Sequence, residues 1–222
     1  MSIQTVGIIG AGTMGNGIAQ ACAVSGVNVV MVDISEAAVA KGIATVTSSL
    51  DRLIKKEKMT EAEKTAALAR IHGSTQYQDL QKAQLVIEAA TENFDLKVKI
   101  LKQVDSLLAE DVVVASNTSS ISITKLAAAT TRADRFIGMH FFNPVPLMKL
   151  VEVVSGLETS KEVADAIFNL SIHWNKPLQM KWYSYVSRSV ERGKEFTLSD
   201  DLFEYLLTQK CVYCGNPHEM TI

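Results

Sequence analysis

The sequence has little of what marks secreted, membrane-spanning or nucleic-acid-binding proteins. Its 222 residues include three cysteines, too few for a disulfide framework. A formal net charge of -2 gives no basic field for capturing nucleic acid. No apolar run approaches the ~20 residues of a membrane span, and the start MSIQTVGIIG lacks the basic flank and cleavage site of a secretory signal. We therefore expect a cytoplasmic protein that contacts neither membrane nor nucleic acid.

What the sequence does contain is a series of short apolar runs, rich in β-branched residues, that predict strands buried on both faces. Helical patterns stand between them: one follows TVGIIG and stops at Gly26, and a longer one begins after Ser35 as its cap. The predicted strands are residues 5–10, 27–33, 85–89, 112–116 and 135–140. Strands alternating with helices predict an α/β fold, a Rossmann-type doubly wound parallel sheet over residues 1–158.

The remaining residues, 159–222, contain no strand-like run. Apolar residues at three- and four-residue spacing predict a short helical tail instead. Its expected helices span residues 160–174, 182–192 and 199–210.

A glycine-rich segment, G-A-G-T-M-G, stands at the first strand-to-helix junction. Gly10 allows a tight turn, Gly12 lets the backbone approach a pyrophosphate, and Gly15 lets helix and strand pack closely. Asp33 ends the second predicted strand, where a carboxylate accepts hydrogen bonds from a ribose diol and repels a 2′-phosphate. The pattern predicts a site for NAD rather than NADP. The alternative is a glycine turn that binds nothing.

The segment GMHFFNPVPLMKLVEVV places an ionisable pair, His140 and Glu152, among apolar residues. Prolines at 144 and 146 force an extended turn, so the chain can return past His140. Period-two alternation puts Glu152 on an otherwise apolar face. A buried carboxylate needs a partner, and a carboxylate beside an imidazole fixes its tautomer, as a general base requires. Alternatively, each residue has a purely structural role.

A polar segment, SNTSS at 116–120, follows the predicted strand at 112–116. Open parallel sheets hold their ligands at the carboxyl ends of their strands. Asn117 and Ser119 are therefore candidates to meet a cofactor and a substrate hydroxyl. A polar turn without function is the alternative.

With these residues in view, the chain resembles the NAD-binding domain of the L-3-hydroxyacyl-CoA dehydrogenases, close to the short-chain 3-hydroxybutyryl-CoA type of bacteria. The resemblance covers residues 1 to about 158. It rests on GIIGAGTMGNGIAQ, VIEAATENFDLKVKI, ASNTSSISI and HFFNPVPLMKLVEVV. It implies interconversion of (S)-3-hydroxyacyl-CoA and 3-oxoacyl-CoA with NAD, in fatty acid metabolism, with acetoacetyl-CoA as a short-chain substrate.

The resemblance also assigns roles to individual residues. It makes His140 the catalytic base, Glu152 its partner and Ser119 the contact of the substrate hydroxyl. Further residues are implied along the cofactor, namely Glu92, Lys97 and Asn117, and two at coenzyme A, namely Ser49 and Lys56. A basic helix end suits the phosphates of coenzyme A. For Lys55, Lys56 and Lys58 the alternative is a solvated face.

The tail departs from the resembled family. The family continues with a catalytic asparagine near position 189 and a helical domain that walls the substrate and forms the dimer, whereas Ser189 and Val190 stand here. An NAD-binding module with little turnover is therefore an alternative to a complete dehydrogenase.

The end of the tail more weakly resembles the leader of HNH nucleases, so a nucleic-acid-binding fusion is a third possibility. Cys211 and Cys214 have metal-ligand spacing, and His218 could be a third ligand. Structural zinc takes four ligands, and we therefore expect no bound metal.

Overall fold

The computed structural model describes residues 3–148 and 150–174. They lie in the first of two units into which the chain divides, Met1–Ser187. The helices predicted at 182–192 and 199–210 fall outside the described residues, as do Cys211, Cys214 and His218.

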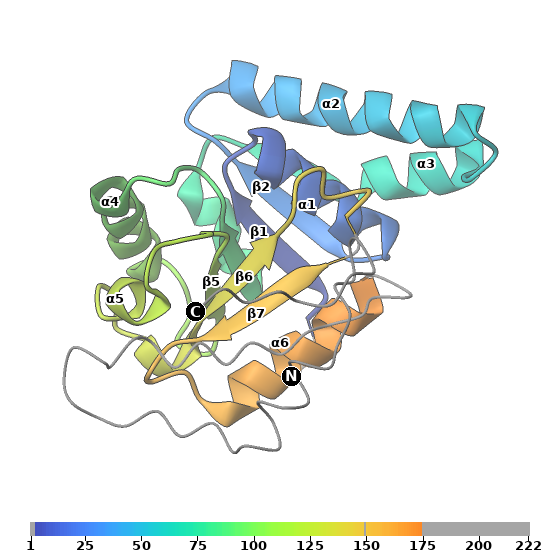
Figure 1. The fold of residues 1–222 in the computed structure, drawn as a ribbon. Helices are drawn as coiled ribbons and strands as arrows, with labels where there is room; N and C mark the ends of the chain where they lie inside the picture. Colours follow the sequence, from blue (N-terminus) through green and yellow to red (C-terminus); the bar gives the residue numbers. More distant parts are fainter. Residues whose placement is uncertain (1–2, 149, 175–222) are drawn as a thin grey trace, which may run out of the picture. The chain divides into compact units, whose positions relative to one another are not determined.

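In the described part of the chain, seven strands form one sheet in the order β3-β2-β1-β4-β5-β6-β7 (Figure 1). The first six strands pair in parallel. The last is antiparallel to β6. The strands are β1 Thr5–Ile9, β2 Asn28–Val32, β3 Ile71–Ser74, β4 Leu85–Glu88, β5 Val113–Ser116, β6 Phe136–Phe141 and β7 Val151–Ser155. The predicted α/β doubly wound sheet is confirmed, with one antiparallel edge strand added.

Helices cover both faces of the sheet, because alternate residues of the central strands are buried on opposite sides. One face carries α1 Thr13–Val24, α2 Glu36–Lys55, α3 Glu61–Ala69 and α6 Lys161–Trp174. The other carries the 3-10 helix η1 Tyr77–Lys82, α4 Phe94–Asp105 and α5 Ile123–Ala127. A short 3-10 turn, η2 Ala133–Arg135, leads into β6.

Local chemistry explains where several helices begin. The hydroxyl of Ser35, the predicted cap, accepts from the Ala38 N–H, which satisfies one of the free donors of the first turn. Thr60 and Glu63 form a reciprocal capping box at the start of α3. The sequence patterns did not predict α3 or the following strand β3.

The predicted helix at 160–174 is present as α6. Its Val163, Ala164 and Ile167 are buried in the same core as α1 and the sheet. This helix therefore shares the core of the sheet, although it follows the predicted domain boundary at residue 158. No helix of the described residues has the length and apolarity to cross a membrane.

The six parallel strands end at one edge of the sheet, where the predicted site residues follow them. The glycine loop follows β1, Asp33 follows β2, and Asn117 follows β5. The strand order reverses direction between β1 and β4, which is the crevice where open α/β sheets bind ligands.

Candidate active site

The glycine loop after β1 has two positions that exclude a side chain. Gly10 has φ +103, and a Cβ there would lie 2.8 Å from the Ala90 Cα. A Cβ on Gly15 would lie 1.8 Å from the carbonyl oxygen of Gly10. Since real Cβ atoms do not approach so closely, both glycines are required for β1, α1 and the segment after β4 to meet.

Gly12 differs, because a Cβ there would meet no atom within 4 Å. It is the N-cap of α1, no side chain caps that helix, and no acidic residue stands in its first turn. The N–H groups and the positive end of the helix dipole are thus left to attract an anion. An open approach at Gly12 and an uncapped helix fit the pyrophosphate of a dinucleotide.

Asp33 is tied to the glycine loop. Its Oδ2 accepts from the Ala11 N–H at 2.7 Å, and its Oδ1 accepts from the Ile34 N–H at 2.7 Å. Each carboxylate oxygen retains a further lone pair, which a ribose hydroxyl can use. Ile34 is 91% exposed beside it.

His140 and Glu152 face each other directly across the β6–β7 pair. Their side chains point to the α4–α5 face of the sheet, opposite to the buried Val151 and Val153. The His140 Nδ1 lies 2.8 Å from the Glu152 Oε2, and the side chains are 20% and 26% exposed. Because a carboxylate can only accept, Nδ1 carries the hydrogen and Nε2 is the basic nitrogen of the neutral ring. The antiparallel turn-back thus brings the two residues together.

The SNTSS segment is held at both ends. The Asn117 N–H donates to the Glu88 carbonyl at 2.8 Å, and its side-chain Oδ1 accepts from the Phe141 N–H at 2.8 Å. This second bond joins the end of β5 to the residue after His140. Ser119, two residues on, is exposed.

Glu92 contacts this segment rather than lying apart from it. Its Oε1 accepts from the Thr118 hydroxyl at 2.6 Å and the Ser119 N–H at 3.0 Å. Burial by itself raises the pKa of the Glu92 carboxyl, but these hydrogen bonds, those from Ser120, and the charge of Lys97 outweigh it and hold the pKa below its ordinary value.

Lys97 lies beneath the sheet edge with no exposed side-chain surface. Its Nζ is 2.5 Å from the Glu88 Oε2, 3.3 Å from the Ser116 Oγ and 3.8 Å from the Glu92 Oε2. The structure therefore places Lys97 behind Glu92. Glu88 and Ser116 were missed from the sequence, although a glutamate that ends an apolar strand was a signal for an inward-facing charge.

A model of the family described as 3-hydroxyacyl-CoA dehydrogenase, NAD binding domain, matches residues 5–180. The chain belongs to this family. A 3-hydroxybutyryl-CoA dehydrogenase of Bradyrhizobium diazoefficiens is 48% identical over 169 residues, 76% of this chain and 56% of that protein. One from Clostridioides difficile is 45% identical over 169 residues, 76% of this chain and 60% of that protein.

The crystal structure of an (S)-3-hydroxybutyryl-CoA dehydrogenase from Ralstonia eutropha has a TM-score of 0.80 and 67% identity, covering 86% of this chain and 68% of that one. The chain spans little more than half the length of the two curated relatives above. The glycine loop and Asp33 thus stand in a domain that the family uses to bind NAD. The family model ends at residue 180, before the tail segment for which a nuclease resemblance was predicted, and the comparisons give that prediction no support.

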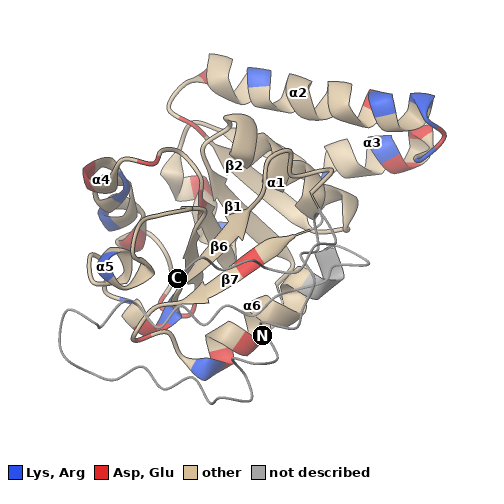
Figure 2. Ribbon diagram, in the orientation of Figure 1, with Lys and Arg blue, Asp and Glu red and all other residues tan. Residues whose placement is uncertain are grey.

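Ser49 and Lys56, implied at coenzyme A, lie on the later part of α2 and at its C-cap. At about 1.5 Å per residue they are some 20 to 30 Å along the helix axis from Ser35. Lys56 is exposed, and among the described residues it forms no ion pair with an acid. Figure 2 shows basic residues, together with acidic ones, at this end of the α2–α3 hairpin. The structure does not bring them to the glycine loop or to His140.

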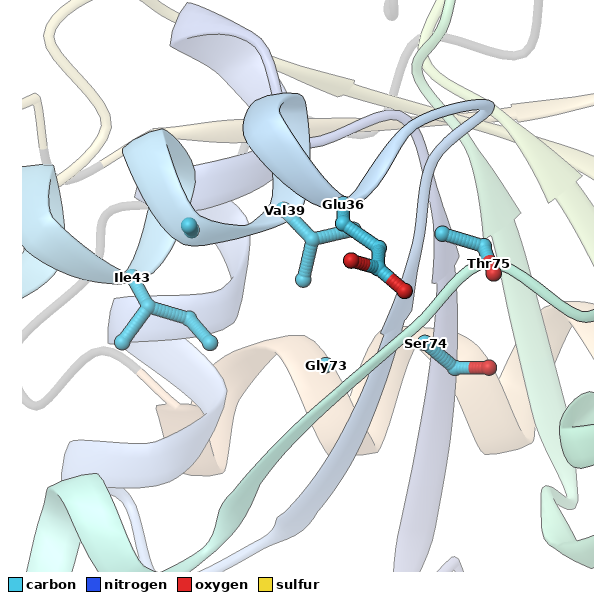
Figure 3. A pocket seen from close by; sticks show the side chains of 7 residues that line it. Glu36, Val39, Ile43, Gly73, Ser74 and Thr75 are labelled. Atoms are coloured by element: carbon cyan, nitrogen blue, oxygen red, sulfur yellow. The ribbon is translucent and has the colours of Figure 1, made fainter.

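A groove of about 460 Å³ opens between the start of α2 and the end of β3 (Figure 3). Glu36, Val39, Ile43, Ser74 and Thr75 line it. It contains none of the predicted site residues, and β3 is the sheet edge opposite to β7. The groove is therefore separate from the His140–Glu152 pair.

The described residues contain no group of three His, Cys, Asp or Glu side chains placed to hold a metal. Cys22 is buried in α1, and burial raises the pKa of its thiol far above the usual range, so it has no nucleophilic character.

Proposed function

We propose that the chain supplies the NAD site and the proton-transferring pair of an (S)-3-hydroxyacyl-CoA dehydrogenase, interconverting (S)-3-hydroxyacyl-CoA and 3-oxoacyl-CoA. The observation that carries the proposal is the hydrogen bond from His140 to Glu152 at the sheet edge that also holds the glycine loop. The printed names of the relatives, 3-hydroxybutyryl-CoA dehydrogenases, favour a short acyl chain such as that of acetoacetyl-CoA.

In the oxidation direction, the Nε2 of His140 takes the proton of the substrate hydroxyl. Glu152 keeps Nδ1 protonated and stabilises the imidazolium that results. When bound, NAD would accept the hydride from the carbon that bears this hydroxyl. In the reverse direction the imidazolium returns the proton to the carbonyl oxygen. A positioned base of this kind contributes about 10²- to 10⁴-fold to rate.

The remaining site residues orient the two ligands in this proposal. Asp33 accepts hydrogen bonds from the ribose hydroxyls. Glu92 and Asn117 lie along the cofactor at the carboxyl ends of the strands. Ser119 donates to the substrate oxygen. Ser49 and Lys56 meet the coenzyme A portion, at a distance along α2 that a long, flexible ligand can span.

A second candidate is an NAD-binding module that turns over little. It is favoured by the length of the relatives, of which this chain covers 56% and 60%. Ser189 and Val190 also stand where the resemblance implies an asparagine. The resemblance also implies a dimer that forms through the family's helical domain, so whether this chain dimerises is tested together with its turnover.

The test combines NAD affinity by calorimetry with NADH oxidation in the presence of acetoacetyl-CoA. His140→Ala should lower turnover at least about a hundredfold while changing NAD affinity by less than about twofold, because the pair is remote from the pyrophosphate. Glu152→Gln should also lower turnover, because the His140 imidazole loses the carboxylate that orients it. His72→Ala is the matched control, an exposed histidine on β3.

Normal acetoacetyl-CoA reduction by His140→Ala would show that the pair is structural. NAD binding without any turnover by the unaltered protein would favour the second candidate.

A further inference from the structure

We propose that Thr118 and Glu92 act together as the positioning residues of Ser119, holding its backbone while its hydroxyl is left able to turn toward the substrate oxygen. The inference rests on the proposed function, since it concerns the residue that meets the substrate. It adds Thr118, a side chain that approaches the reaction only through its neighbour.

The first observation is that one carboxylate oxygen serves four donors. The Glu92 Oε1 accepts from the Thr118 Oγ1 at 2.6 Å, the Ser119 N at 3.0 Å, the Ser120 Oγ at 3.1 Å and the Ser119 Oγ at 3.2 Å. A carboxylate has about four lone-pair sites over its two oxygens. Four donors on one oxygen therefore compete, and the longest contacts are the weakest.

The weakest of these contacts is the Ser119 hydroxyl. It can leave Glu92 at little cost, because the other three donors remain to satisfy the oxygen. The Ser119 N–H has no such freedom, since it is fixed to the backbone and stays bonded to the same carboxylate. The hydroxyl is thus pre-placed by its backbone and free to rotate into the site.

Thr118 is the buried member of the loop, 7% exposed, whereas Ser119 and Ser120 are exposed. Its hydroxyl donates to Glu92 and accepts from the Ile121 N–H at 3.0 Å and the Ser120 N–H at 3.3 Å. One hydroxyl therefore links Thr118, just before Ser119, to the two residues that follow Ser119. A valine of the same shape would remove every one of these bonds.

Glu92 is held in turn from beneath. The ammonium of Lys97 lies 3.8 Å from its Oε2 and is itself fixed by Glu88 at 2.5 Å. A fully buried cation behind a half-exposed carboxylate keeps that carboxylate charged and oriented. The buried Lys97 thus holds Glu92 in place, and Glu92 in turn holds the loop that carries Ser119.

The experiment measures the affinity of acetoacetyl-CoA for the 222-residue protein saturated with NAD⁺, two oxidised compounds that cannot react with each other. The variants are Thr118→Val, Ser119→Ala, the double variant and Thr118→Ser. Amide hydrogen exchange at Ser119 is followed in the same proteins. Thr159→Val is the matched control, because the Thr159 hydroxyl likewise donates one hydrogen bond, to the Phe136 carbonyl, and accepts an N–H, that of Gly156.

We expect Thr118→Val and Ser119→Ala each to weaken acetoacetyl-CoA binding about fivefold, the scale of one hydrogen bond. The double variant should be no weaker than the poorer single variant, because Thr118 acts through Ser119. Thr118→Ser should recover most of the affinity. Exchange at the Ser119 amide should rise at least about tenfold in Thr118→Val and stay unchanged in Thr159→Val.

Additive losses in the double variant, or a Ser119→Ala loss with none in Thr118→Val, would overturn the inference and leave the proposed function standing. If the unaltered protein does not bind acetoacetyl-CoA, the proposed function fails. Amide exchange then decides by itself: unchanged exchange in Thr118→Val overturns the positioning role, and faster exchange supports it.

Discussion

Replacing Asp33 should change both the cofactor preference and the stability of the glycine loop. In the unaltered protein we expect NAD to bind at least about tenfold more tightly than NADP, a difference of about 1.4 kcal/mol. The carboxylate accepts the ribose hydroxyls and opposes the charge of an added 2′-phosphate. Asp33→Ala removes both effects, so the two affinities should approach each other, mainly through weaker NAD binding.

The structure indicates that Asp33→Ala also lowers the stability of the folded protein. Asp33 accepts the Ala11 and Ile34 N–H groups, each at 2.7 Å. Hydrogen bonds to a charged group contribute about 1.5 to 3 kcal/mol where the partner is buried, and Asp33 is half-exposed. We therefore expect Asp33→Ala to lower the free energy of unfolding by about 1 to 3 kcal/mol.

Calorimetry with NAD and NADP measures the preference, and urea unfolding measures stability. Glu36→Gln is the control, because it removes a carboxylate three residues away that has no hydrogen bond to the glycine loop within the described part of the chain. It should leave both quantities nearly unchanged. Equal affinities of the unaltered protein for NAD and NADP, or an unchanged preference in Asp33→Ala, would refute the reasoning.

Three further predictions concern the Arg132–Asp105 ion pair, the Glu92 carboxyl and the rate of the 222-residue protein. Arg132→Ala should lower the free energy of unfolding by about 3 to 5 kcal/mol, because Asp105 loses the cation 2.5 Å from its Oδ1; urea unfolding beside the half-buried Arg135→Ala tests this. The lowered pKa of Glu92 means that its stabilisation is present above the ordinary carboxyl pKa and lost as pH falls through the folded value. The Tm advantage over Glu92→Gln should therefore shrink below about pH 4, and an advantage that grew there would contradict the assignment. The 222-residue protein should reduce acetoacetyl-CoA at least about a hundredfold more slowly than the Bradyrhizobium relative, about 2.7 kcal/mol in barrier, because it covers only 56% of that protein; equal steady-state rates would refute this.

Features that depend on near neighbours in the chain could be predicted from the sequence alone. The strands at β1, β2, β4, β5 and β6 were predicted from apolar runs, because a strand buried on both faces needs them. The start of α2 followed from Ser35, since a cap acts within one turn. The glycine spacing predicted the loop, because the absence of a side chain is a local property.

Other features depended on contacts between distant segments. The strand β3, IHGS, has too few apolar residues to stand out, and it forms because β2 offers a parallel partner. The direction of β7 follows from the turn after β6, which no pattern within β7 records. The predicted meeting of His140 and Glu152 depended on a register that only this pairing sets.

The burial of Lys97 depends most clearly on tertiary packing. The resemblance implied a residue along the cofactor, but packing of α4 on the sheet carries the ammonium under Glu92 and against Glu88. The hydrogen bond from the Thr118 hydroxyl to Glu92 likewise joins residues 26 apart in the chain. A sequence pattern shows which side chains are charged or apolar, whereas partner choice depends on distances that exist only once the layers have packed.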